Sequence, residues 1–306
     1  MNWRRVKNWL GIGVIVTLSL FAVAPVLSVV VSIYAAGAAA IASLGGLATF
    51  LTAEPPDPFA TSGGVGPLLA GTLYMTALGA AAGILVGFPI GIYIGEFKRD
   101  KLSHVARGAV NMLVEFPTIA MGLFVYGMFS MVRGDVNSVL APLSRDLSSV
   151  LGGWVTWFVG PLDFYNAYIG AAALAIVMIP YVALFTASAY ASIDQPLREA
   201  AYSLSGREYK AVFTVLRKVV WRAVLASFLL GTAKIAGETA PLFFTALGNH
   251  YYAPFTGPTG AVTLWIYEAA QSSYKVQVDS AYGAAAVLLT VVLALFILAK
   301  LLGRGR

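Results

Sequence analysis

Two charged side chains, Lys234 and Glu238, stand four residues apart inside an otherwise apolar stretch of the chain. Residues at this spacing share one face of a helix, where opposite charges can pair. Placing such a charge at the centre of a bilayer costs about 2.5–3.5 kcal/mol on insertion scales, so these residues pair or face a wet cavity. Pro241 follows closely and cannot donate a helical hydrogen bond. The pattern predicts a route for a polar solute, with a purely structural ion pair as the alternative.

The connection 192–222 contains a second informative pattern. Pro196 precedes a run of good helix formers that extends from Leu197 to Lys210. Proline favours the first turn of a helix, and Leu, Arg, Glu and Ala favour its interior. We therefore expect a short helix of mixed charge along the membrane surface. It is either a solvated connector or a helix that docks into a groove of a soluble partner.

Residue types for catalysis and metal binding are scarce. The chain has no cysteine, and its two histidines, His104 and His250, lie too far apart for a metal-binding motif. It lacks the G-x-x-x-x-G-K-[ST] nucleotide loop and the H-E-x-x-H and G-x-S-x-G hydrolase motifs. Glu115 and Asp163 are too scattered for a membrane enzyme that acts on lipids. We expect no cofactor and no metal, and any energy source must be a partner.

The composition indicates a protein surrounded by lipid. Hydrophobic residues make up 59% and charged residues 11% of the chain, with a mean hydropathy of +0.80. An ordinary soluble protein carries about 25% charged residues. A helix needs about 20 apolar residues to cross a bilayer. The sequence predicts an all-α integral membrane protein with six transmembrane helices, at about Trp9–Tyr34, Pro67–Gly95, Asn111–Val132, Tyr165–Ala191, Ala223–Leu247 and Tyr282–Leu302.

The basic residues predict the orientation. Most lie near the two termini and in two connections, 96–110 and 192–222, whereas only Arg133, Arg145 and Lys275 fall in the opposite connections. Cytoplasmic loops carry this excess, so both termini are expected in the cytoplasm of a cell-membrane protein. The pI near 9.4 therefore reflects orientation, and no nucleic-acid partner is expected. The first span exceeds the about 7–15 apolar residues of a signal peptide, which favours a retained helix over a cleaved one.

Glycine recurs every fourth residue along the second predicted span. The positions are Gly79, Gly83, Gly87, Gly91 and Gly95. On a helix this spacing forms a groove in which another backbone can approach closely. The partner is either a helix of the same chain, which is the expected case, or a helix of a second subunit.

Several stretches resemble one family of transport proteins. Residues 237–246, Gly-Glu-Thr-Ala-Pro-Leu-Phe-Phe-Thr-Ala, closely resemble the fifth-span motif of phosphate-specific permeases of the PstA type. Glu199-Ala200-Ala201 resembles the EAA loop of importer permeases of the ATP-binding-cassette (ABC) class. The stretches 63–74 and 116–124 agree with the same family, so the resemblance covers about residues 60–300. The 237–246 motif is specific, whereas the EAA element alone indicates only the importer class.

The resemblance implies a type I ABC importer permease fold. Residues 1–60 would form an N-terminal transmembrane helix and an external connection, and residues 61–306 the permease core. The expected partners are a homologous permease in a heterodimer, two ATP-binding subunits and an external phosphate-binding protein. The chain itself would be no enzyme, because its partners would hydrolyse ATP while it moves inorganic phosphate by alternating access.

The resemblance also assigns residues to roles. In the EAA-type loop 192–222, the residues expected to couple to the ATPase subunits are Arg198, Glu199, Ala200, Ala201 and Gly206. The family pattern expects glycine one position earlier, where Ser205 stands. The residues expected to line the substrate path are Lys234, Glu238, Thr239 and Thr118, with the two threonines as hydroxyl donors.

One departure bears on the substrate. Lys234 stands where the phosphate family usually has arginine, and lysine cannot make the two-pronged contact of a guanidinium with phosphate. Three alternatives therefore stay open beside a phosphate importer. They are an ABC importer of another oxyanion, an importer of another small solute, and a passive anion channel that needs no ATPase.

Overall fold

The structure is a computed structural model that describes residues 3–303, and this range contains helices but no strand. Arg304 and Arg306, two of the basic residues used to predict the orientation, lie outside the described range. The helices are α1 (Trp3–Ser43), α2 (Gly46–Thr52), α3 (Gly66–Glu96), α4 (Lys101–Glu115), α5 (Thr118–Leu151), the 3-10 turn η1 (Gly153–Trp157), α6 (Ala167–Ala191), α7 (Gln195–Ser205), α8 (Glu208–Lys210), the π-helical η2 (Ala211–Leu216), α9 (Arg217–Ala236), α10 (Ala240–Thr245), α11 (Val262–Ala269) and α12 (Lys275–Gly303).

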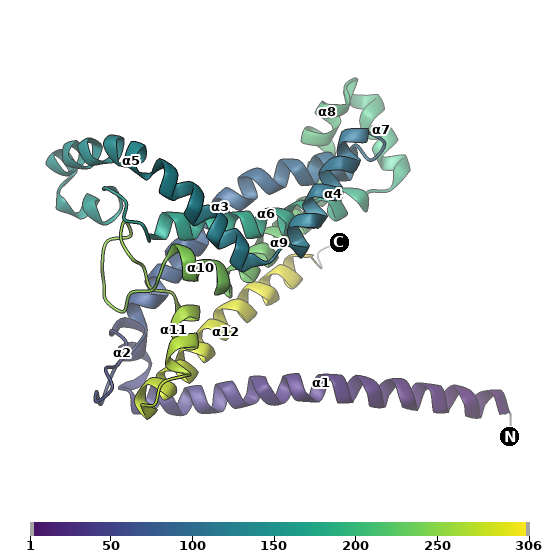
Figure 1. The fold of residues 1–306 in the computed structure, drawn as a ribbon. Coiled ribbons are helices and arrows are strands. Elements are labelled where there is room, and N and C mark those ends of the chain that lie inside the picture. Colours follow the sequence, from purple (N-terminus) through teal and green to yellow (C-terminus); the bar gives the residue numbers. More distant parts are fainter. Residues whose placement is uncertain (1–2, 304–306) are drawn as a thin grey trace.

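Six of the described helical segments are long and apolar enough to cross a membrane, as the sequence predicts. They are Lys7–Ser43, Gly66–Glu96, Thr118–Leu151, Ala167–Ala191, Glu208–Ala236 and Lys275–Gly303. The N-terminal half of α1 extends away from the other helices, while its C-terminal half lies beside α12 (Figure 1). At that crossing a Cβ atom on Gly37 would lie 2.6 Å from the Cβ atom of Ala286, so the two helices touch closely.

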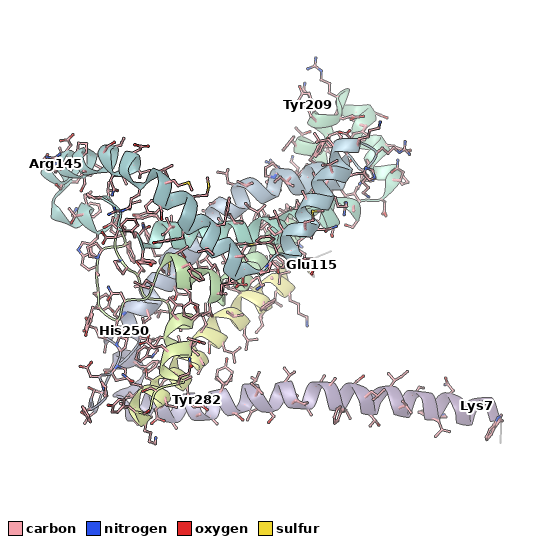
Figure 2. All side chains as sticks on the ribbon, in the orientation of Figure 1. Lys7, Glu115, Arg145, Tyr209, His250 and Tyr282 are labelled. Atoms are coloured by element: carbon pink, nitrogen blue, oxygen red, sulfur yellow. The ribbon has the colours of Figure 1, made fainter. Side chains whose placement is uncertain are left out.

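The predicted third span, 111–132, is wrong at both ends. Phe116 adopts an extended conformation (φ −74°, ψ 134°) and ends α4, because the following Pro117 disfavours helical backbone in the residue before it. A new helix, α5, then runs without a break from Thr118 to Leu151. Figure 2 shows Glu115 at the junction of the two helices, far from Arg145 near the other end of α5.

The first and last spans are longer than predicted. The stretch after Tyr34, expected to belong to the external connection, continues α1 to Ser43, since its alanines are the best helix formers. The last helix starts at Lys275 instead of Tyr282, and its first turn contains an ion pair between Lys275 and Asp279 at 2.5 Å. A pair at this spacing supports a helix outside the apolar segment.

The glycines of α3 pack directly against α6, as expected for a contact within the chain. A Cβ atom would lie 2.8 Å from the carbonyl oxygen of Ile179 if placed on Gly87, and 2.6 Å from that of Ala183 if placed on Gly91. Real Cβ atoms do not approach so closely, so only glycine permits this distance between the two backbones. The α3–α6 pair forms the centre of the bundle (Figure 1).

The two ends of the bundle differ. The end that carries α7 and α8, called the α7 end, includes Tyr209, whereas His250 lies at the end near α2 and α11, called the α2 end (Figure 2). The main buried cluster lies between these ends, where Met178, Val182, Ile235 and Leu242 bring α6, α9 and α10 together. The junction of α9 and α10 is therefore surrounded by helices in the middle of the bundle.

Candidate substrate path and coupling helix

The predicted fifth span, 223–247, is interrupted. The helix that enters it from the α7 end stops at Ala236, and α10 begins at Ala240 after three non-helical residues. Pro241 occupies the first turn of α10, where its missing N–H has no helical partner to lose. Proline thus begins a new short helix instead of kinking a continuous one. The helix is therefore interrupted a few residues before Pro241, the residue that cannot donate a helical hydrogen bond.

Lys234 and Glu238 form an ion pair across this break. The Glu238 side chain is only 9% exposed, whereas the Lys234 side chain is 43% exposed. The hydroxyl of Thr263 on α11 donates to the Glu238 carbonyl at 2.9 Å and holds the non-helical turn. The Lys234 ammonium also lies 5.8 Å from the ring centroid of Tyr181 on α6, a distance at which a cation and a ring attract. The pair therefore buries its negative partner and leaves its positive partner accessible to an anion.

The start of α5 lies against this junction. A Cβ atom on Gly122 would lie 2.6 Å from the Cα atom of Pro241, so α5 and α10 touch at the backbone. Thr118 is one turn before Gly122 and therefore on the same face of α5. Thr118 and Thr239 are both half-buried, and within residues 3–303 neither hydroxyl bonds the ion pair. Their assignment as donors on the path stays a prediction.

The coupling residues predicted on α7 divide between its two faces. Glu199 and Ala200 are exposed, and so is Leu204 one turn later, at 86% exposure. Ala201 is buried against Val212 and Leu216 of η2. Arg198 points inward as well. Only one face of α7 is thus free to contact another protein, a division that the linear motif does not reveal.

Gly206 ends α7 in the left-handed conformation, with φ 65°. Its N–H donates to the Tyr202 carbonyl at 3.2 Å, a common way to finish a helix, and glycine adopts this φ without the penalty that a side chain imposes. No atom lies within 4 Å of the Cβ position there. The glycine one residue beyond the family position is therefore the C-terminal residue that the helix needs, and Ser205 is its last helical residue.

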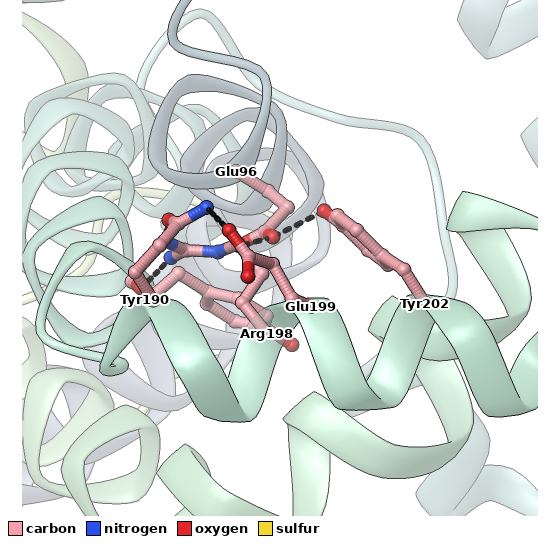
Figure 3. Close-up of polar contacts among 6 residues, drawn as sticks. Glu96, Tyr190, Arg198, Glu199 and Tyr202 are labelled. Atoms are coloured by element: carbon pink, nitrogen blue, oxygen red, sulfur yellow. Dashed lines mark hydrogen bonds and ion pairs between the residues drawn. The ribbon is translucent and has the colours of Figure 1, made fainter.

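Glu96, which the sequence analysis did not identify, binds the inward face of α7 (Figure 3). Arg198 donates from Nε to Glu96 Oε1 at 2.7 Å and from Nη2 to Oε2 at 3.3 Å. Tyr202 donates to the same Oε1 at 2.5 Å. Burial raises the pKa of the Tyr202 phenol, and the bond to Glu96 raises it further, so the hydroxyl stays protonated and donates. The sequence contains one sign of this role, because Glu96 is an acidic residue at the end of an apolar span and lies close to Lys98 and Arg99.

The described residues offer no metal centre, since no group of three or more His, Cys, Asp or Glu side chains comes together in the range 3–303. Two features of the described residues remain candidates for the predicted substrate path and coupling helix. A half-exposed cation lies in the middle of the bundle, and an exposed amphipathic helix lies at one end of it.

The chain is similar in sequence to known transport proteins. Residues 87–305 match the family described as the inner membrane component of binding-protein-dependent transport systems. A probable phosphate transport system permease protein PstA of Methanocaldococcus jannaschii is 32% identical over 96% of this chain and 92% of its own length. The phosphate transport system permease protein PstA of Yersinia pestis is 28% identical over 98% of this chain and 91% of its own.

A solved structure shares the fold. An inward-facing structure of the MetNI methionine ABC transporter aligns with 77% of this chain and 94% of its own, with a TM-score of 0.52 and 15% identity. At this identity the likeness concerns the fold alone, and it confirms the predicted permease fold. Together with the family match and six apolar helices, it shows that this chain is a multi-pass membrane protein and belongs to the family of binding-protein-dependent transport inner membrane components.

Proposed function

We propose that this chain is the permease subunit of an ATP-driven importer that carries inorganic phosphate across the cell membrane. The observation that carries the proposal is the ion pair in the middle of the bundle, in which a buried Glu238 holds an accessible Lys234. A positive group beside a broken helix attracts an anion, and membrane depth tolerates such breaks where protein or a wet cavity receives the free backbone groups. The relatives named as phosphate permeases support phosphate as that anion.

In the proposed transport cycle, the two ends of the bundle meet different partners. An external binding protein delivers phosphate at the α2 end, while two ATP-binding subunits dock at the α7 end and close on ATP. Their closure moves α7 and switches the path from inward-open to outward-open. The chain pairs with a homologous permease, both its termini lie in the cytoplasm, and it catalyses no reaction itself. Residues 1–60 form an N-terminal transmembrane helix and an external connection, and residues 61–306 form the permease core.

The docking part of this proposal predicts a specific loss. Leu204→Asp places a charge on the most exposed apolar side chain of α7, so the ATPase groove can no longer bury it. Burying a leucine contributes about 1.5–3 kcal/mol, and an unpaired charge there adds a penalty. We expect the ATP-binding subunit to be lost when the complex is purified through this chain.

The matched control is Phe59→Asp, which changes an equally exposed apolar side chain near the α2 end, at 87% exposure. It should leave recovery of the ATP-binding subunit unchanged. Full recovery with Leu204→Asp would show that α7 is a solvated connector, the alternative that the sequence pattern leaves open.

The substrate is tested by competition. In vesicles that contain the assembled complex, unlabelled phosphate should suppress uptake of labelled phosphate, whereas equal concentrations of sulfate or molybdate should not. This expectation rests on the relatives named as phosphate permeases, because Lys234 provides a point charge whose contact with an anion is itself little selective by geometry. Equal competition by sulfate or molybdate would identify an importer of another oxyanion.

A further inference from the structure

We infer that Glu96, Arg198 and Tyr202 form a clamp that transmits movement of α7 to α3 and α6 during transport. This inference rests on the proposed function of α7 as the element on which the ATP-binding subunits dock. It assigns positioning roles to Glu96, which lies outside the EAA-type loop, and to Tyr202, which lies within that loop but is not one of the predicted coupling residues. It also reassigns Arg198 from docking to transmission.

The charged pair of the clamp is buried, and both oxygens of its carboxylate are paired. The Glu96 side chain is 0% exposed and the Arg198 side chain 13% exposed. The two bonds from Arg198 and the bond from Tyr202 occupy both carboxylate oxygens (Figure 3). Bidentate bonds between a guanidinium and a carboxylate fix the relative orientation of their two elements as well as their distance. The last residue of α3 is thereby held to the middle of α7.

The same guanidinium also holds α6. Arg198 Nη2 donates to the Tyr190 carbonyl at 2.9 Å, and Tyr190 lies in the last turn of α6. Carbonyls at a helix C-terminus lack helical partners and accept such bonds readily. One arginine on α7 therefore binds the ends of both α3 and α6. Gln195 adds two contacts within α7, since its amide donates to Glu199 Oε1 at 2.8 Å and its carbonyl oxygen accepts from Arg198 Nη1 at 3.4 Å.

The two held helices move together, because the glycines of α3 interlock with the backbone of α6 along their length. α7 reaches α9 by a different connection. Ala201 packs in one apolar cluster with Val212 and Leu216 of η2. Hydrophobic contacts are not directional, so they do not fix the orientation of one helix relative to another. The backbone that connects α7 to α9 passes through Gly206, and no atom lies within 4 Å of the Cβ position of this glycine. Directional force from α7 thus passes through the clamp into the α3–α6 pair, which carries Tyr181 beside Lys234.

The test measures phosphate taken up per ATP hydrolysed by the complete complex in vesicles. Glu96→Gln removes the charge and keeps the shape, Arg198→Met removes the guanidinium, and Tyr202→Phe removes one hydroxyl. All three should retain the ATP-binding subunits and hydrolyse ATP. We expect the uptake-to-hydrolysis ratio to fall at least about fivefold in Glu96→Gln and Arg198→Met, the lower end of common couplings between sites. Tyr202→Phe, which preserves packing, should show a smaller fall.

Lys275→Met is the control, because it removes an ion pair whose lysine is 87% exposed at the opposite end of the bundle. It should leave the ratio unchanged. An unchanged ratio in the three clamp variants would overturn the inference. So would loss of the ATP-binding subunits with a normal ratio in the complexes that remain, since the clamp would then only stabilise α7. Failure of the unaltered chain to recover an ATP-binding subunit would instead refute the proposed function, and the clamp with it.

Discussion

Gly87→Leu is expected to prevent α3 and α6 from packing and to remove most of the folded protein. The Cβ atom alone would lie 2.8 Å from the Ile179 carbonyl oxygen and 3.0 Å from the Val182 Cβ atom. Both of these atoms belong to α6, so the clash can be relieved only if α3 and α6 move apart. Overpacking costs about 1–3 kcal/mol in cores whose side chains can adjust, and a backbone obstacle cannot adjust in that way. The measurement is the fraction of monodisperse protein after extraction in mild detergent, with its thermal midpoint.

Gly13→Leu is the matched control for this prediction. Gly13 lies inside a helical span too, but no atom lies within 4 Å of its Cβ position. The same substitution should therefore leave both the yield and the thermal midpoint unchanged. Equal loss in the two variants would mean that leucine harms the protein for a reason other than the α3–α6 contact. A normal Gly87→Leu protein would contradict the packing described for these helices.

Lys234→Met is expected to reduce phosphate uptake to background. It deletes the accessible cation and leaves Glu238, 9% exposed, without its partner. Breaking a fully buried ion pair costs about 3–5 kcal/mol, and solvent around the 43% exposed Lys234 side chain lowers that figure here. Lys234→Arg keeps the charge and should retain uptake. The measurement is the initial uptake rate, normalised to the amount of assembled complex in the vesicles.

A double variant separates a path from a structural ion pair. In Lys234→Met combined with Glu238→Met, no unpaired charge remains, so stability should recover relative to Lys234→Met alone. Uptake should stay at background, because the cation that attracts the anion is absent. Recovery of uptake together with stability would show that the pair serves the fold only, the alternative that its spacing alone leaves open.

The number of spans follows from the sequence because it depends on length and hydropathy, two properties that the residues themselves carry. The ends do not follow as well. Lys275 and the residues after it are polar enough to resemble a loop, yet they are helical, and the pair between Lys275 and Asp279 supports this first part of α12. Pro117 is evident in the sequence, but it lies within a continuous apolar stretch that resembles a single span. The structure shows that Pro117 forces Phe116 into an extended conformation, which separates α4 from α5.

Contacts between residues of one helix could be predicted from the sequence, whereas contacts between different helices could not. Lys234 and Glu238 lie one helical turn apart, so their pairing is a property of a single helix. The contact of Glu96 with Arg198 joins residues 102 positions apart, and no spacing rule indicates it. The same holds for the division of α7 into an exposed and an inward face. That division depends on where α3 and η2 lie, which only the packed bundle determines.

The most direct test of the proposed importer is uptake of labelled phosphate into vesicles that contain this chain with a homologous permease, the ATP-binding subunits and the phosphate-binding protein. We predict uptake that requires hydrolysable ATP and disappears in Glu238→Gln, whose amide cannot hold the Lys234 charge. Uptake that proceeds equally without ATP would contradict this prediction and indicate a passive anion channel.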